Sequence, residues 1–233
     1  MPHSALGLLA FGFVLGLRHA LDVDHLAAVS TIVTSRRSLW ASSIVGAVWG
    51  LGHTAALLAV ALVVVGLHAQ IPPRLGAGLE LAVAAMLVGL GLNLLGTLWR
   101  GGRLHFHGHA HDGREHLHPH VHPRTQRDAT QHHPVRAARR PFVVGLIHGL
   151  AGSAALMLGV LATIPSPRLA LAYVATFGGG SIGGMIAMST LLGMPLALAA
   201  ERFARAELVL RACAAVGSVA VGVLLALATG LPR

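Results

Sequence analysis

The chain has 233 residues, of which 55% are hydrophobic and only 11% are charged, with a formal net charge of +9 at pH 7. Soluble globular domains carry about 25% charged residues, so this composition excludes an ordinary soluble domain and predicts a multi-pass membrane protein. All of the basic side-chain charge comes from arginine, and in such a protein it indicates orientation and lipid contact rather than nucleic-acid binding.

Six apolar stretches are long enough to cross a hydrocarbon core of about 30 Å, which takes about 20 helical residues. The sequence therefore predicts an all-α integral membrane protein with six transmembrane helices, over residues 5–32, 40–67, 75–98, 142–164, 169–199 and 207–229. The first, second and fifth stretches are longer than a perpendicular crossing needs. Each also contains a polar or glycine-rich run, so we expect interrupted helices at residues 18–25, 50–53 and 178–184.

The first stretch contains five ionisable groups, in the run Arg18-His19-Ala20-Leu21-Asp22-Val23-Asp24-His25. A charge in the middle of a bilayer costs about 2.5–3.5 kcal/mol on insertion scales, so such a cluster indicates a functional site. Two imidazoles and two carboxylates suit divalent first-row metals, and a polar turn between two short helices is the alternative. On a continuous helix His19, Asp22 and His25 share a face, whereas a break would let Asp24 join the histidines. The sequence leaves the choice between the two aspartates open.

The second and third stretches add two further candidates. His53 lies within an apolar run, where a lone histidine is often only hydrogen-bonded to a neighbouring backbone group. Because a His/Asp cluster is expected in the first span, we predict that His53 is a metal ligand as well. Asn93 in the third stretch is a secondary candidate, which would contact the metal or orient one of its ligands.

The connection over residues 100–141 is rich in histidine, glycine, proline and arginine and has almost no apolar residues. Such a tract cannot bury a core, so we expect a disordered loop between two membrane domains, residues 1–99 and 142–233. Histidine-rich tracts are a compositional sign of metal binding, which is lost as imidazoles protonate below about pH 6.5. A solvated basic linker is the alternative. We predict a metal-collecting role for His105, His107, His109, His111, His116, His118, His120 and His122.

An internal repeat relates the two halves of the chain. The nine residues from Phe13 align with the nine from Phe142, so that His19 matches His148, and the run 50–53 aligns with the run 178–181. Three spans per half is an odd number, so the halves must be inverted relative to one another in the membrane. Inverted repeats with interrupted helices are typical of transporters, whose binding site lies between the halves near the membrane midplane.

The second half contributes three candidate site residues. His148 is expected to bind the metal directly or to orient one of its ligands through a hydrogen bond. Ser153 and Ser181 are secondary candidates of the same kind, since each lies in a run of small residues that permits close helix approach.

Arginine positions predict the orientation of the chain. The connections after the first, third and fifth spans hold most of the arginines, whereas the opposite side carries only Arg74, Arg168 and Arg233. Because arginine accumulates on the cytoplasmic side, both termini are predicted to be non-cytoplasmic and the His-rich loop cytoplasmic. We expect a multi-pass protein of a bacterial-type cell (inner) membrane. Its expected partners are the lipid bilayer, the metal ion and a cytoplasmic metallochaperone, without nucleic acid.

Two motifs carry a resemblance to a known family. His19, four residues and then Asp24-His25 resembles the signature of the nickel/cobalt transporter family, and Leu51-Gly52-His53-Thr54 resembles that family's second-span element. The chain is most similar to a shorter six-span branch that includes urease-accessory-type nickel permeases. The resemblance implies transport of Ni²⁺ or Co²⁺ as substrate, with uptake preferred. It also implies that His19, Asp24 and His25 are the principal determinants, supported by His53.

Three alternatives to uptake remain: efflux through the same site, a metal-binding accessory subunit without transport of its own, and an intramembrane metal hydrolase. The sequence has no His-Glu-x-x-His motif, so we expect no enzyme. No organic cofactor is expected. The sequence also has no glycine-rich loop ending in Lys-Ser/Thr, so the energy is expected to come from ion gradients, the membrane potential or a separate partner.

Overall fold

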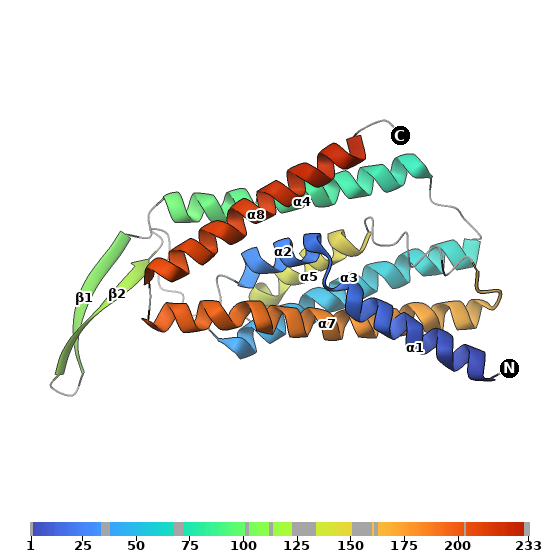
Figure 1. The fold of residues 1–233 in the computed structure, drawn as a ribbon, viewed down its shortest axis with the longest axis horizontal. Coiled ribbons are helices and arrows are strands. Elements are labelled where there is room, and N and C mark those ends of the chain that lie inside the picture. Colours follow the sequence, from blue (N-terminus) through green and yellow to red (C-terminus); the bar gives the residue numbers. More distant parts are fainter. Residues whose placement is uncertain are drawn as a thin grey trace.

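The computed structural model describes residues 2–33, 38–67, 72–100, 103–111, 114–122, 134–150, 160, 163–202 and 204–230. Within these residues long helices lie side by side along one axis, and a two-stranded hairpin projects from one end (Figure 1). The helices are α1 Pro2–His19, α2 Val23–Val33, α3 Leu39–Leu67, α4 Pro73–Trp99, α5 Pro134–Leu150, α7 Pro167–Arg202 and α8 Ala204–Gly230. The N-terminus and the end of α8 both lie at the end of the bundle opposite the hairpin.

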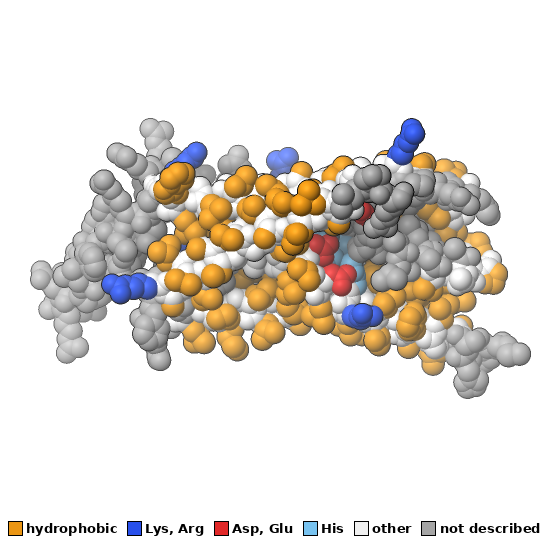
Figure 2. Space-filling view, turned by 45° about the horizontal axis from the view of Figure 1, so that its top comes forward, with side chains coloured by type: hydrophobic (Ala, Val, Ile, Leu, Met, Phe, Trp, Pro, Cys, Tyr) orange, Lys and Arg blue, Asp and Glu red, His pale blue; other side chains and the backbone are white. Residues whose placement is uncertain are grey.

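Several of these helices are long and apolar enough to cross a membrane. Four pass this test individually, over Leu39–Leu67, Arg74–Trp99, Pro167–Pro195 and Arg205–Gly230, and α1 with α2 adds a fifth if the bent pair is one span. Of the predicted span 142–164, α5 covers the first part and residues 151–159 lie outside the described structure. Large apolar side chains such as Leu62, Val63 and Leu224 face outward, as expected for a bundle surrounded by lipid (Figure 2).

The predicted interruption is found in the first span. α1 and α2 meet at an angle of 57°, with residues 20–22 as the turn between them. The N–H of Leu21 donates to the carbonyl of Arg18 at 2.9 Å, and that of Asp22 to the carbonyl of His19 at 3.1 Å, which tightens the last turn of α1. The carbonyl of Asp22 then accepts the first hydrogen bond of α2, from Leu26 at 3.0 Å. Asp22 therefore stands at the N-cap position of α2, where aspartate is favoured.

The predicted interruptions in the second and fifth spans are wrong. α3 is continuous through Gly50–His53, and α7 is continuous through the glycine-rich run 178–184. These glycines serve close packing instead. A Cβ atom at Gly180 would collide with the carbonyl oxygen of Phe13, and one at Gly52 with the carbonyl oxygen of Phe142. Backbones approach this closely only at the smallest residues, so the glycines bring α1 against α7 and α5 against α3.

The two helix pairs make matching contacts. Phe13 and Phe142 are aligned positions of the internal repeat, as are Gly180 and Gly52. A second matched set lies one turn further along: a Cβ at Gly16 would collide with the carbonyl oxygen of Phe177, and one at Gly145 with that of Trp49. The α1–α7 pair therefore packs in the same way as the α5–α3 pair.

α3 and α7 run antiparallel and contact one another along most of their length. Near one end, the hydroxyls of Ser43 and Thr190 lie 2.7 Å apart. Eleven positions further along α3, the Thr54 hydroxyl donates to the Gly178 carbonyl at 3.2 Å. A step forward along α3 is thus a step backward along α7.

The His-rich connection differs from its prediction as a disordered loop. The structure forms two antiparallel strands there, β1 Arg103–His111 and β2 Arg114–His122. Their register runs from Arg103 opposite His122 to His111 opposite Arg114. The hairpin lies at the end of the bundle where α4 ends and α8 begins (Figure 1).

Candidate metal centre

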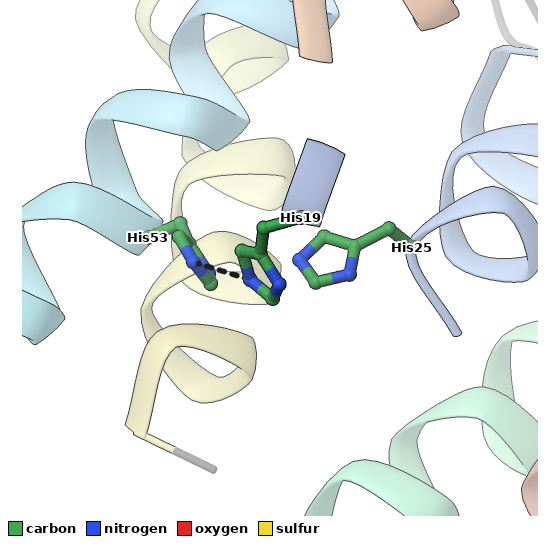
Figure 3. A group of neighbouring side chains, drawn as sticks. All are labelled: His19, His25 and His53. Carbon is green, nitrogen blue, oxygen red and sulfur yellow. Dashed lines mark hydrogen bonds between the residues drawn. The ribbon is translucent and has the colours of Figure 1, made fainter. Parts of the chain in front are cut away.

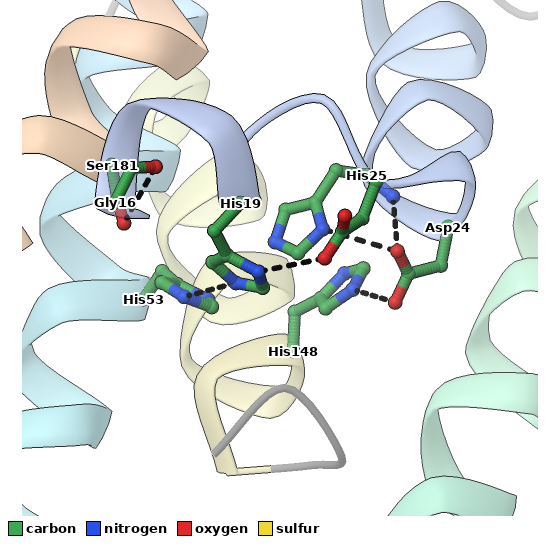
Figure 4. Close-up of polar contacts among 8 residues, drawn as sticks. Gly16, His19, Asp24, His25, His53, His148 and Ser181 are labelled. Carbon is green, nitrogen blue, oxygen red and sulfur yellow. Dashed lines mark hydrogen bonds and ion pairs between the residues drawn. The ribbon is translucent and has the colours of Figure 1, made fainter. Parts of the chain in front are cut away.

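Four histidines from four helices converge at the α1–α2 break (Figure 4). His19 is the last residue of α1, His25 lies in the first turn of α2, His53 lies in the middle of α3, and His148 lies in the last turn of α5. Their exposed fractions are 7%, 1%, 0% and 1%. Ionisable side chains buried at the centre of an apolar bundle are costly, which makes this cluster the leading candidate for a functional site.

A first set of three metal-ligating atoms comes from His19, His25 and His53, which lie within 4.8 Å of one another. The Nε2 atoms of His19 and His53 are 3.3 Å apart, and the ring centroids of His19 and His25 are 4.4 Å apart (Figure 3). Three imidazoles suit divalent first-row metals such as nickel, cobalt, copper and zinc.

A second set comes from Asp24, His25 and His148, whose ligating atoms also lie within 4.8 Å of one another. The carboxylate of Asp24 joins the two imidazoles: one oxygen lies 3.1 Å from His25 Nδ1 and the other 2.9 Å from His148 Nε2 (Figure 4). The two rings lie 4.1 Å apart between centroids. His25 therefore belongs to both sets.

The helix break determines how the two aspartates are used. Because α2 starts in a new direction, Asp24 reaches the histidines and contacts two of them. Asp22 contacts only one, with its carboxylate 2.8 Å from His19 Nδ1. The side chain of Asp24 is 29% exposed and that of Asp22 is 52% exposed. Figure 2 shows acidic and histidine side chains at the surface among mostly hydrophobic ones, with a basic side chain nearby.

If the four imidazoles are neutral, their hydrogen-bond contacts allow one consistent placement of the protons. His25 Nδ1 and His148 Nε2 face the Asp24 carboxylate, so each carries the N–H that donates to it. His19 Nδ1 donates to Asp22 in the same way, so its Nε2 accepts from His53 Nε2. This leaves lone pairs on His25 Nε2, His53 Nδ1 and His148 Nδ1, and these three buried atoms have no hydrogen-bond partner among the described residues. Histidines that donate one N–H to a carboxylate and keep the other nitrogen free are typical of metal ligands.

Helix ends add a favourable field for a cation. α1 ends at His19, and His148 lies in the last turn of α5, so the C-terminal ends of two helices point at the cluster. A helix C-terminus carries a partial negative charge equivalent to about half an elementary charge, which stabilises a nearby cation. The N-terminus of α2 has the opposite sign, and Asp24 in its first turn offsets it.

Among the described residues, neither Ser181 nor Asn93 hydrogen-bonds to any of the four histidines. The Ser181 hydroxyl donates to the backbone carbonyl of Gly16 at 3.3 Å, one turn before His19, rather than to an imidazole. Asn93 is exposed on α4, and the described residues show no contact between it and the four histidines, so its contribution stays a prediction. Ser153 lies outside the described residues. The histidines predicted to collect metal belong to β1 and β2, far from the α1–α2 break in Figure 1.

Two aromatic neighbours of the cluster are not among the residues predicted from the sequence. The ring of Trp49 lies 5.3 Å from that of His25 and 5.7 Å from that of His148, and the ring of Phe177 lies 5.4 Å from that of His19. Both are buried. Trp49 precedes His53 by four residues and therefore shares its helix face, but this spacing is equally typical of an ordinary core residue.

Comparison with known proteins gives one informative match. The sequence is 36% identical over 202 residues to the urease accessory protein UreH of Bacillus sp. (strain TB-90). The alignment covers 84% of this chain and 81% of that protein, so the similarity extends well beyond the two short motifs. No protein-family model matches the chain, and no solved structure matches it.

Proposed function

Because this chain belongs to the family of the urease accessory protein UreH, we propose that it transports nickel or cobalt ions across a membrane, in the direction of uptake. The observation that carries this proposal is the buried cluster of four imidazoles and Asp24 at a broken, apolar helix. Imidazole nitrogen, the main donor type in this cluster, suits nickel among the divalent first-row metals, and the Asp24 carboxylate adds a harder oxygen donor. The resemblance of the motif around His19 and Asp24 to nickel/cobalt transporters points to the same substrate.

In this proposal the substrate ion exchanges its water for protein ligands at the cluster. Asp22 and Asp24, the partly exposed members, attract the ion and offset its charge. His25, together with His19 and His53 on one side and with Asp24 and His148 on the other, supplies the ligands. Two overlapping sets of ligands favour passage of the ion, because a transported ion must be bound well enough to enter and loosely enough to leave.

The proposed architecture is a pair of inverted three-helix repeats with six spans, the fourth of which begins with α5. The matched packing of α1 on α7 and of α5 on α3 supports it, as does the antiparallel course of α3 and α7. The binding site then lies between the halves near the membrane midplane, as is usual for such transporters.

The hairpin and the membrane potential complete the proposal. The His-rich hairpin is assigned to the cytoplasmic side of a cell membrane, where it collects the ion or passes it to a metallochaperone. An inward-negative potential favours cation entry by about 2.3 kcal/mol per charge per 100 mV, so uptake needs no nucleotide hydrolysis by this chain. Transport is favoured over catalysis because both carboxylates next to the cluster contact imidazoles, which leaves neither free as a separate general base.

Metal flux into proteoliposomes of defined orientation tests the proposal. Ni²⁺, Co²⁺, Zn²⁺ and Mn²⁺ are compared for the natural chain, for His25→Ala and for the control His68→Ala, which removes a histidine that follows α3 in the sequence. We expect Ni²⁺ or Co²⁺ flux that His25→Ala abolishes and His68→Ala retains. Flux that survives His25→Ala contradicts the site. Metal flux that runs only from the hairpin side to the opposite side identifies an exporter.

An accessory subunit without transport of its own is the second candidate, which the word "accessory" in the name of the UreH relative favours. This candidate predicts Ni²⁺ binding by the purified chain without flux of any ion. Flux that appears only after a partner protein is added would establish it.

A further inference from the structure

The two aromatic neighbours of the cluster occupy matched positions. Phe177 on α7 packs against His19, and Trp49 on α3 packs against His25 and His148. In the internal repeat His19 aligns with His148, and the run that ends in His53 aligns with the run that ends in Ser181. Trp49 and Phe177 stand four residues before those run ends, so each half places one aromatic ring against the helix-terminal histidine of the other half.

The two rings lie on opposite sides of the cluster. Trp49 lies one turn before His53, toward the contact between Ser43 and Thr190. Phe177 lies one turn before Ser181, and because α7 is antiparallel to α3 this turn points the other way, beyond the contact between Thr54 and Gly178. The Trp49 side faces the hairpin end of the bundle, and the Phe177 side faces the end that carries the N-terminus (Figure 1).

Each ring belongs to its own apolar cluster. Phe177 packs with Leu57, Ala61, Ala170, Tyr173 and Val174, whereas Trp49 belongs to a larger group that includes Val29, Val33, Val45, Val144 and Met185. All of these side chains are buried. An apolar constriction next to a polar site excludes water and hydrated ions without any specific contact.

We infer that Trp49 and Phe177 are the two barriers that close the imidazole cluster off from the two ends of the bundle. Trp49 closes the hairpin end and Phe177 closes the N-terminal end. The inference rests on the proposed transport function, and it adds that passage requires the two barriers to open one at a time. Their matched backbone contacts, at Gly145 and Gly16, let the same local movement serve either barrier.

Thiol labelling tests the barriers without any metal flux. Cys213, exposed on α8, is the single cysteine of the chain, so Cys213→Ser gives a cysteine-free background. Ser181→Cys then places a thiol at a fully buried position of α7, between Phe177 and the level of Trp49, since Gly50 next to Trp49 lies against Ile182. A membrane-impermeant thiol reagent is applied from one side at a time, and tryptic cleavage of the arginine-rich connection 100–141 identifies the hairpin side.

We expect the Ser181→Cys chain to be protected from both sides. Adding Trp49→Ala should raise labelling from the hairpin side only, and adding Phe177→Ala from the opposite side only, each by about tenfold relative to the control Leu87→Ala. Leu87 on α4 is a fully buried member of the apolar cluster that contains Trp49. Its truncation therefore tests whether any cavity in this core is enough to raise labelling. The variants Trp49→Phe and Phe177→Leu keep a large apolar side chain and should remain protected.

Labelling from the same side in both alanine variants, from neither side, or equally in Leu87→Ala overturns the inference. So does a Ser181→Cys thiol that reacts freely from either side before any barrier is changed. If the barriers behave as expected while the natural chain moves no metal, the barriers stand and the transport proposal fails. If metal flux is present but the two variants do not open opposite ends, transport stands without these barriers.

Discussion

His25 occupies a special position among the site residues, because it is the one histidine that belongs to both sets of ligating atoms. We expect His25→Ala, made in a chain that lacks the hairpin residues 103–122, to abolish Ni²⁺ binding by the purified protein. His148→Ala should retain weakened binding, since His19, His25 and His53 stay within 4.8 Å of one another. Isothermal titration calorimetry in detergent measures both affinities. Equal loss of affinity in the two variants would indicate a single site that needs every ligand.

The two aspartates give a second prediction at this scale. Asp24 accepts hydrogen bonds from two imidazoles, whereas Asp22 contacts one and is more exposed. Asp24→Asn should therefore lower Ni²⁺ affinity by about 10- to 100-fold, the usual effect of removing a carboxylate that orients metal-binding histidines. Asp22→Asn should have a smaller effect. The same titration tests both, and a larger loss for Asp22→Asn would contradict the assignment.

The sequence picks out the residues of the cluster better than their roles. His19, His25, His53 and His148 do lie together, and their binding of metal stays a prediction. The sequence does not choose between the aspartates, because that choice depends on the direction in which the chain leaves α1. Trp49 and Phe177 escape detection for another reason: an aromatic residue in an apolar helix has the same pattern whether it packs against a histidine or in an ordinary core.

Close helix packing gives a prediction at the scale of the element. Two adjacent glycines of α7 have opposite surroundings: a Cβ at Gly180 would collide with the Phe13 carbonyl oxygen, whereas one at Gly179 would meet nothing within 4 Å. Gly180→Ala should destabilise the protein by about 1–3 kcal/mol, the usual cost of overpacking. Gly179→Ala should be neutral or slightly stabilising. Thermal unfolding in detergent compares the pair, and equal effects would mean that α1 does not pack on α7 here.

These glycines also explain which helix interruptions the sequence could predict. A glycine run is compatible with a break and with close packing, and only the neighbouring helix decides between them. At Gly52 and Gly180 the nearest neighbour is a backbone carbonyl, and both helices continue through these residues. In the first span the turn is encoded locally, by an aspartate that stands at the N-cap position of α2.

At the scale of the whole molecule, the hairpin and the chain termini lie at opposite ends of the bundle (Figure 1). Arginine is concentrated toward the hairpin end, which predicts that this end is cytoplasmic. Alkaline phosphatase fused to the C-terminus should therefore be active, because it needs an oxidising compartment to form its disulfides. A fluorescent-protein fusion at the same position is the complementary measurement. Phosphatase activity after insertion into the 112–113 connection, instead of at the C-terminus, would reverse the orientation.

Deleting the hairpin tests whether the bundle binds metal independently of the hairpin. Removal of residues 103–122 takes away eight histidines and none of the four at the α1–α2 break, so we expect a lower Ni²⁺ stoichiometry with one bound ion retained. Metal analysis after gel filtration measures this. Loss of all bound metal would place the principal site in the hairpin rather than in the bundle.

The sequence predicts the long helices of the bundle better than it predicts the structure of the His-rich connection. Apolar length predicts the long helices, because every backbone group in lipid must be paired within the chain. The histidine-rich connection has too few apolar residues to predict regular structure, yet its backbone pairs as β1 with β2. Backbone pairing does not need the apolar core whose absence suggested disorder.

One mismatch between the aligned runs falls on a site residue, since His53 stands where the second half has Ser181. Two identical inverted halves would make a molecule with two equivalent ends. An ion would then meet the same ligands from either surface of the membrane. Imidazole nitrogen holds nickel or cobalt far better than a serine hydroxyl, so this difference helps to make the two ends of the site chemically distinct.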